Sequence, residues 1–304
     1  MAAVLLEPDG SPRFAGFGAD EHREFEIGSI TKTVTAALAL DAIAQGALTE
    51  DSTVADVLGD RAASSAIADV TVRELTAHTS GIPSLPAEMG WGTALRSMLR
   101  KNPYAGRTPD DVIDAALSSA PSGRGTYAYS NLGTALEGQL VATAVGTPWH
   151  ELVRTRLVEP LGLTETRVPR TVAELGDDAP AGHIADGHGA APWPQDGYAP
   201  AGGVRSTTAD MATYLASMID GTNPGAAGIE PTVEIGEGQG IGFHWVTTTT
   251  ADGQRLVWHN GMTGGFASFG GWNRETGRGV VLLTDSAISL DGLAVAVLTG
   301  EVAA

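Results

Sequence analysis

Residues 31–44 carry Ala, Leu, Val and Ile at helical spacing, and Gly46 follows the last apolar turn. Gly at this position commonly ends a helix, because it adopts a left-handed backbone without steric cost. The apolar residues are spread around much of the helix circumference, which is typical of a helix buried on several sides. The pattern therefore predicts a largely buried helix with Ser29 at its opening, and 304 residues supply enough chain to surround it.

Runs rich in β-forming residues lie at both ends of the chain. Residues 2–6 and 13–18 flank a turn at residues 8–11, which predicts a hairpin. Four more runs follow in the last third, separated by short turns that favour an antiparallel meander. They are residues 241–249, 254–259, 266–272 and 279–284.

The centre of the chain is mainly helical in pattern. We expect helices at residues 132–145, 150–161, 206–219 and 290–298, and a long Gly/Pro/Asp-rich loop at residues 174–203. The fold class is therefore predicted to be α+β, with an antiparallel sheet from both chain ends flanked by helices and joined to an all-helical lobe. We place an α/β lobe at residues 1–50 and 195–304 and the helical lobe at residues 51–194.

The formal net charge is −18, from 18 Lys and Arg against 36 Asp and Glu. This charge repels phosphate backbones and anionic lipids, so we expect neither nucleic acid nor a membrane as partner. The chain has no Cys, which excludes disulfides, thiol nucleophiles and Cys-ligated metals. We find neither a signal peptide nor a run of about 18 apolar residues, and we expect a cytoplasmic protein. The oligomeric state is left open.

Lysine is rare, with Lys32 and Lys101 standing against sixteen arginines. A buried lysine can lose its proton and act as a base, whereas arginine cannot. Lys32 follows Ser29 by three residues, a spacing that puts both on one face of a helix. An adjacent base activates a serine hydroxyl as a nucleophile, so both are candidate catalytic residues. A serine that caps the helix is the simpler structural explanation.

Two further triplets carry groups suited to the same chemistry. Tyr129 and Asn131 are two residues apart, so in an extended segment both face one cleft, where a phenol can shuttle protons and an amide can hold a carbonyl. His259-Asn260-Gly261 lies on a predicted strand, and Gly261 leaves room for a ligand. The structural alternatives are a core tyrosine followed by an Asn helix cap, and a surface histidine near a strand end.

These three motifs, in this order, make the chain resemble the serine β-lactamase and penicillin-binding-protein superfamily. Within it the chain is similar to class C β-lactamases, family VIII esterases, D-aminopeptidases and DD-peptidases, which share the Ser-x-x-Lys signature. Four longer segments also match, so the resemblance covers nearly the whole chain. They are residues 72–83, 129–162, 201–214 and 264–284.

The resemblance implies one β-lactamase-like catalytic domain of two lobes that works through an acyl-enzyme, with no cofactor and no metal. Ser29 would attack a carbonyl and become acylated. Lys32 and Tyr129 would share the general-base and general-acid work, in an order left open. The backbone N–H groups of Ser29 and Met262 would form the oxyanion hole.

The resemblance further implies substrate-binding roles for Asn131, His259 and Gly261. Where β-lactamases carry Lys-Thr-Gly, this chain has His259-Asn260-Gly261, so a fixed cation for a substrate carboxylate is missing. Histidine is neutral for much of the time at neutral pH. This pattern is similar to the esterase, aminopeptidase and some carboxypeptidase branches, and it disfavours efficient β-lactam hydrolysis.

We therefore expect a serine hydrolase, carboxylesterase-like or amidase-like, whose partner is a small-molecule ester, amide or lactam. The alternatives are an acyltransferase of small-molecule biosynthesis, a weak β-lactamase or D-aminopeptidase, and a non-catalytic binding protein on the same fold. Trp91, Trp193 and Trp245 are candidates either for a substrate groove or for the core. We expect His78 to bond within its own loop.

Overall fold

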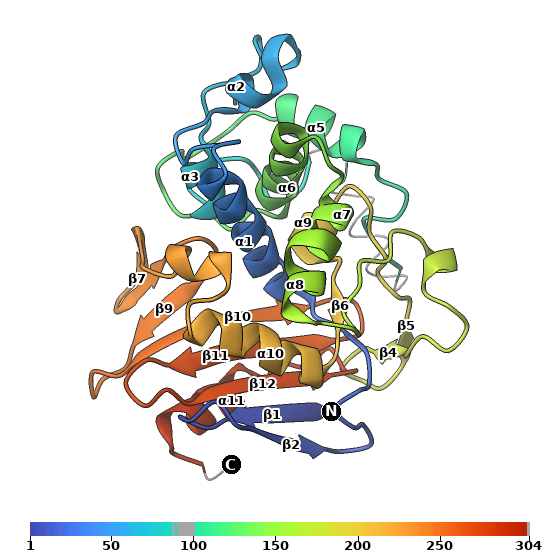
Figure 1. Cartoon of the computed structure of the whole chain (residues 1–304). Helices are drawn as coiled ribbons and strands as arrows, with labels where there is room; N and C mark the ends of the chain where they lie inside the picture. The colour runs from blue at the N-terminus through green and yellow to red at the C-terminus, as the bar shows by residue number, and fades with distance from the viewer. Residues whose placement is uncertain (87–88, 90–100, 303–304) are drawn as a thin grey trace.

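The computed structural model describes residues 1–86, 89 and 101–302. Its main sheet has eight strands in the order β2-β1-β12-β11-β10-β9-β8-β7, with antiparallel neighbours. Strands from the two chain ends lie side by side, as the sequence predicts, because β1 pairs with β12 (Figure 1). The strands are β1 Ala2–Leu6, β2 Pro12–Gly16, β7 Val233–Gly236, β8 Gln239–Ile241, β9 Val246–Thr249, β10 Arg255–Met262, β11 Ala267–Asn273 and β12 Gly279–Thr284.

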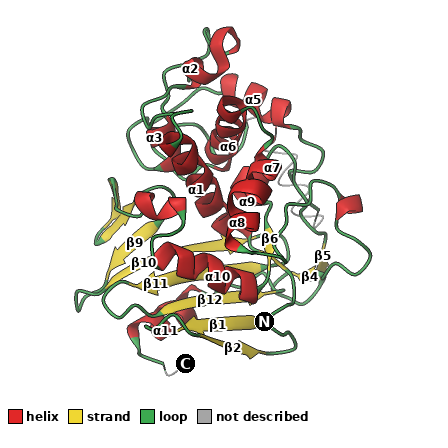
Figure 2. Cartoon of the chain, viewed as in Figure 1, coloured by secondary structure: helices red, strands yellow, loops and turns green. Residues whose placement is uncertain are grey.

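Both faces of this sheet are covered by helices, and β12 shows how. Successive side chains of a strand point to opposite faces. Val281 and Leu283 accordingly join the core cluster that contains residues of α10 (Thr208–Ile219), whereas Val280 and Leu282 join the cluster that contains residues of α11 (Asp291–Thr299). Figure 2 shows α10 lying across one face of the sheet. A strand covered on both faces reads as an unbroken apolar run.

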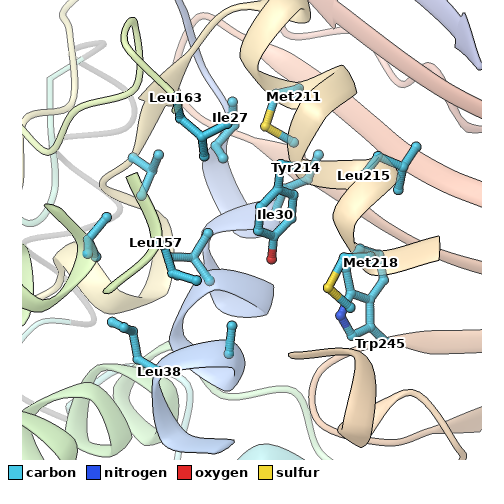
Figure 3. Close-up of a cluster of buried hydrophobic side chains, with 14 of the residues drawn as sticks. Ile27, Ile30, Leu38, Leu157, Leu163, Met211, Tyr214, Leu215, Met218 and Trp245 are labelled. Atoms are coloured by element: carbon cyan, nitrogen blue, oxygen red, sulfur yellow. The ribbon is translucent and has the colours of Figure 1, made fainter. Parts of the chain in front are cut away.

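Helix α1 (Thr31–Ala44) is buried along most of its length, which confirms the sequence prediction. Figure 3 shows it between α10, which contributes Met211, Leu215 and Met218, and the segment that contributes Leu157 and Leu163. The helix therefore stands between the sheet and the remaining helices. Any polar side chain on its first turn is removed from water.

A second core cluster fills the helical part of the molecule. Three of its helices begin at capping boxes in which a Thr side chain and an acidic side chain satisfy each other's backbone N–H groups, at Thr53, Thr71 and Thr108. The helices are α2 Val54–Leu58, α3 Val72–Thr76, α5 Pro109–Leu117 and α6 Asn131–Val145. The division into two lobes at residues 50 and 195 stays our proposal.

Some predicted elements differ from those observed. The run at 241–249 is interrupted because His244 has a left-handed φ of 60°. The helix predicted at 150–161 is divided by a π-helical turn ahead of Pro160, whose missing N–H cannot continue the α-helical ladder. The long loop contains short elements as well. The remaining elements are β3 Phe25–Glu26, η1 Gly28–Ile30, η2 Gly59–Arg61, α7 Trp149–Val153, η4 Arg154–Val158, α8 Glu159–Leu161, η5 Val172–Glu174, β4 Gly182–His183, β5 Gly189–Ala190, α9 Ala199–Gly202, β6 Arg205–Ser206 and η6 Pro224–Gly228.

Among the described residues, no helix combines the length and apolarity that crossing a bilayer requires.

Candidate active site

Ser29 and Lys32 meet at the junction of two helical segments. Ser29 lies in the short turn η1, and Lys32 lies in the first turn of α1 and is completely buried. The Lys32 Nζ atom donates a hydrogen bond to Ser29 Oγ at 3.1 Å. The three-residue spacing thus brings the two groups together. Ser29 itself lies in a 3₁₀ turn, which is tighter than the α-helical turn that the sequence predicted.

The Lys32 ammonium group has three N–H donors, and each has an acceptor. Besides Ser29 Oγ, they are Asn131 Oδ1 at 2.8 Å and the carbonyl oxygen of Ala201 at 2.6 Å. Asn131 is the first residue of α6, whereas Ala201 belongs to α9, which was not predicted from sequence. Three elements therefore fix the position of Nζ.

Tyr129 approaches Ser29 from the segment ahead of α6. Its hydroxyl donates to Ser29 Oγ at 2.7 Å, and Lys32 Nζ stands 4.8 Å from its ring centroid. Although 38% of Tyr129 is exposed, desolvation raises the pKa of its hydroxyl well above the ordinary value. Asn131 Nδ2 donates to the Tyr104 hydroxyl at 3.2 Å, a contact that sequence reasoning missed. The structure thus brings Ser29, Lys32, Tyr129 and Asn131 together.

Burial sets the charge state of Lys32. Desolvation lowers the pKa of Lys32 to about 7, and the negative charge of Glu137 on α6 acts in the opposite direction. Neutral lysine is therefore well populated at neutral pH. That population meets the requirement for a base beside the Ser29 hydroxyl.

A buried cluster of three side chains lies behind these residues. Glu137 Oε2 and His244 Nε2 are 2.7 Å apart, and His244 Nδ1 is 3.3 Å from His78 Nε2. The prediction that His78 bonds within its own loop is wrong: its Nδ1 accepts from the Ser130 N–H at 3.3 Å, and its ring lies 4.6 Å from that of Tyr129. His78 and His244 are also the non-glycine residues of the described chain with positive φ, at 56° and 60°. Such backbone strain persists only where surrounding contacts enforce it.

Strand β10 brings a second backbone segment against η1. Gly28 has a φ of 50°, and a Cβ at this residue would lie 2.7 Å from the Met262 amide nitrogen. A Cβ at Gly261 would lie 2.1 Å from the Ile27 oxygen and 2.8 Å from the Ser29 amide nitrogen. Both positions require glycine because the two backbones touch. The amides of Ser29 and Met262, the predicted oxyanion hole, consequently lie at this contact.

Two cavities border Ser29, and Met262 lines both. The smaller is lined by Asn131, Tyr104 and Trp193 among others, and the larger, of about 270 Å³, by Tyr129 and Gly261 among others. Of the three candidate groove tryptophans, Trp193 thus borders the site and Trp245 lies in the core. Trp91 lies outside the described residues.

His259 is buried in the sheet and does not line either cavity at Ser29. It belongs to β10, and its Nδ1 lies 2.5 Å from the Asn260 carbonyl oxygen. Desolvation, assisted by the positive charge of Lys32, lowers the pKa of His259 to about 3. His259 is therefore neutral near pH 7. Its predicted substrate-binding role stays a prediction.

No group of three or more His, Asp or Glu side chains in the described part of the chain has the arrangement of a metal site. The metal-free reaction implied by the sequence stays a prediction.

Comparisons with known proteins give a consistent result. A model of the β-lactamase family matches residues 2–302. Penicillin-binding protein 4* of Bacillus subtilis is 27% identical over 222 residues, covering 66% of this chain and 48% of that protein. Penicillin-binding protein 4 of Amycolatopsis lactamdurans is 31% identical over 156 residues, covering 51% of this chain and 38% of that protein. This chain thus spans about half, or less, of the length of these curated relatives.

Solved structures share the fold. The penicillin-binding protein homologue from Pyrococcus abyssi aligns with a TM-score of 0.81 at 24% identity, covering 98% of this chain and 73% of that one. A D-stereospecific amidohydrolase from Streptomyces sp. aligns with a TM-score of 0.81 at 22% identity, covering 99% of this chain and 94% of that one. At these identities the similarity shows the α+β fold and its mixed helix and antiparallel-sheet architecture.

Proposed function

The chain belongs to the β-lactamase family, and on this premise we propose that it is a serine hydrolase that cleaves an ester or amide through an acyl-Ser29 intermediate. The observation that carries the proposal is the convergence on one atom. Ser29 Oγ accepts hydrogen bonds from both Lys32 Nζ and the Tyr129 hydroxyl, at 3.1 and 2.7 Å. A structural serine cap does not require a buried lysine and a tyrosine at its oxygen.

In the proposed acylation step, neutral Lys32 takes the Ser29 proton as Oγ attacks the substrate carbonyl carbon. A lysine pKa of about 7 supports Lys32 as the base, whereas the raised pKa of Tyr129 disfavours its phenolate. Tyr129 then gives its phenol proton to the departing oxygen or nitrogen and regains a proton from the Lys32 ammonium. Water attacks the acyl-Ser29 ester by the same sequence and releases the acid.

The oxyanion formed in each step is assigned to the backbone N–H groups of Ser29 and Met262. Their closeness follows from the glycine contacts between η1 and β10. Losing one such donor typically costs about 3–4 kcal/mol of transition-state stabilisation. The substrate class is supported by the Streptomyces amidohydrolase of the same fold and by the absence of a cation among the described cavity-lining residues, which does not favour β-lactams.

The proposal is tested by trapping the intermediate. We expect intact-mass spectrometry to show one adduct after incubation with p-nitrophenyl acetate or a fluorophosphonate, and none with Ser29→Ala. Activity on the ester should fall by at least about 10³-fold in Ser29→Ala and in Lys32→Met. Ser118→Ala, which changes a serine at the end of α5, is the matched control and should label as the wild type does. Labelling that survives Ser29→Ala, or no labelling of a folded wild type, contradicts the proposal and favours a non-catalytic binding protein.

A further inference from the structure

The larger cavity beside Ser29 opens between the end of β10 and the start of α11. It has a volume of about 270 Å³, and its lining includes Asn260, Ser289 and Asp291. Asp291 is the charged residue among the described residues that line either cavity at Ser29. A carboxylate therefore borders a space next to Ser29 that a bound substrate can occupy.

The position of Tyr129 indicates which part of the substrate enters this cavity. The reacting carbonyl carbon has to sit at Ser29 Oγ, and Ser29 borders both cavities, so each cavity can receive one of the two substituents of that carbon. Tyr129 lines the larger cavity and Asn131 the smaller. Because the proposed proton donor to the departing atom is Tyr129, the leaving group belongs in the larger cavity and the acyl group in the smaller.

The Asp291 carboxylate is held in place. Asn260 Nδ2 donates to Asp291 Oδ2 at 2.9 Å. Asp291 is also the first residue of α11, which is anchored on the sheet through the buried side chains of Ala294, Val297 and Leu298. The carboxylate thus belongs to a helix packed on the sheet, and one of its oxygens is bonded to a side chain of β10.

No Lys, Arg or His is among the described residues that line this cavity. Lys32 lines neither cavity, and in its protonated form its three donors are directed at Ser29, Asn131 and Ala201. His259, which stands where β-lactamases carry a lysine, is buried and neutral near pH 7. An anionic leaving group would meet the Asp291 carboxylate without a compensating cation, whereas a cationic one would be attracted.

We propose that the cavity bounded by Tyr129, Asn260 and Asp291 is a leaving-group subsite selective for cationic over anionic groups, with Asp291 as the specificity-determining residue. The proposal rests on the acyl-Ser29 mechanism above. It predicts that natural substrates carry an ammonium or a similar cation on the alcohol or amine that departs. A leaving group that carries a carboxylate is disfavoured.

Three aryl acetates test this selectivity, because they share the acyl group and differ at one meta substituent. They are the meta-trimethylammonio, meta-tert-butyl and meta-carboxy phenyl esters, of which the first two have nearly the same shape. Each kcat/KM is divided by the rate constant for hydroxide-catalysed hydrolysis, which removes the difference in leaving-group reactivity. In the wild type we expect the corrected kcat/KM of the trimethylammonio ester to exceed that of the tert-butyl ester by about three- to tenfold. The corrected kcat/KM of the carboxy ester should be lower than that of the tert-butyl ester.

Asp291→Asn keeps the shape of the side chain and an acceptor for Asn260 while removing the charge. It should bring the cation-to-neutral ratio close to one, whereas Asp60→Asn, an equal change of net charge at an exposed residue of η2, should leave the ratio at the wild-type value. The subsite proposal is contradicted if the wild type has equal corrected kcat/KM values for the cationic and the neutral ester. It is also contradicted if the cation-to-neutral ratio of the wild type is unchanged in Asp291→Asn. If the neutral ester still acylates Ser29, the failure concerns the subsite alone; if no ester acylates Ser29, the proposed function fails with it.

Discussion

Lys32 carries an ionisable group that is completely buried, and its neighbours determine the position and the pKa of that group. Its three hydrogen bonds hold the nitrogen beside Ser29 Oγ, while desolvation lowers its pKa to about 7. The Glu137 carboxylate, held by His244, favours the protonated form of Lys32. Burial and Glu137 thus act in opposite directions on the same pKa, and the balance places it near neutrality.

Glu137→Gln removes the negative charge while keeping an oxygen acceptor for His244. The pKa of Lys32 should then fall below its wild-type value, because protonated Lys32 loses a favourable interaction. Since the active form needs neutral Lys32, the acidic limb of the pH profile of kcat/KM should move to lower pH. We expect the ratio of kcat/KM at pH 6 to that at pH 9 to rise by about two- to fivefold.

Steady-state rates from pH 5 to 10 measure this limb. Glu237→Gln, at an exposed position of the turn between β7 and β8, is the charge-matched control and should leave the limb in place. A purely structural role for Glu137 would lower the rate equally at every pH. A limb that stays fixed or moves to higher pH would show that Glu137 does not act on Lys32.

The contact between η1 and β10 places two separate backbone segments within one site. Gly28→Ala should damage this contact in two ways, since alanine is strained at a φ of 50° and its Cβ would lie 2.7 Å from the Met262 amide nitrogen. We expect kcat to fall by about 10²- to 10³-fold as this oxyanion donor moves. Gly18→Ala is the matched control, because its φ of 70° imposes similar strain where no atom lies within 4 Å.

Backbone strain should cost each variant about 1 kcal/mol of unfolding free energy, measured by urea denaturation. Gly28→Ala should lose more than Gly18→Ala, because its Cβ also meets the Met262 backbone. The value of kcat should fall in Gly28→Ala and stay at the wild-type value in Gly18→Ala. Comparable kcat values for the two variants would mean that the Met262 amide does not stabilise the reaction.

Local sequence patterns predicted the elements whose causes are local. The Ala/Leu run of α1, the helix α10 and the apolar strand β12 were predicted close to their observed bounds. The joining of Ser29 with Lys32 followed from helical spacing. By contrast, the π-helical turn ahead of Pro160 depends on how neighbouring turns share hydrogen bonds, which periodicity does not describe.

The parts of the site that sequence reasoning missed depend on contacts between distant segments. Ala201 lies 169 residues from the lysine that donates to it, and Glu137 lies 107 residues from His244. A carbonyl acceptor has no sequence signature, and a Glu inside an apolar helix does not identify its partner. Asp291 was likewise inconspicuous, because only the packing of α11 on the sheet places it beside the end of β10.

The net charge of −18 adds a long-range effect to the local charge of Asp291. A cationic substrate is attracted by the whole protein, but this attraction acts through water and is screened by salt. Asp291, in contrast, acts across the cavity itself. The two contributions are therefore separable by ionic strength.

Raising the ionic strength from about 0.01 to 0.15 M shortens the screening length from about 30 to 8 Å. The kcat/KM of the meta-trimethylammonio ester should then fall severalfold in both wild type and Asp291→Asn, while that of the neutral tert-butyl ester should hardly change. The cation-to-neutral ratio that remains at high salt should be larger in wild type than in Asp291→Asn, since a carboxylate in contact with the bound cation is screened much less. A preference that salt abolishes equally in both proteins would assign the selectivity to the overall charge. A preference independent of salt would show that the field of the remaining carboxylates does not reach the cleft.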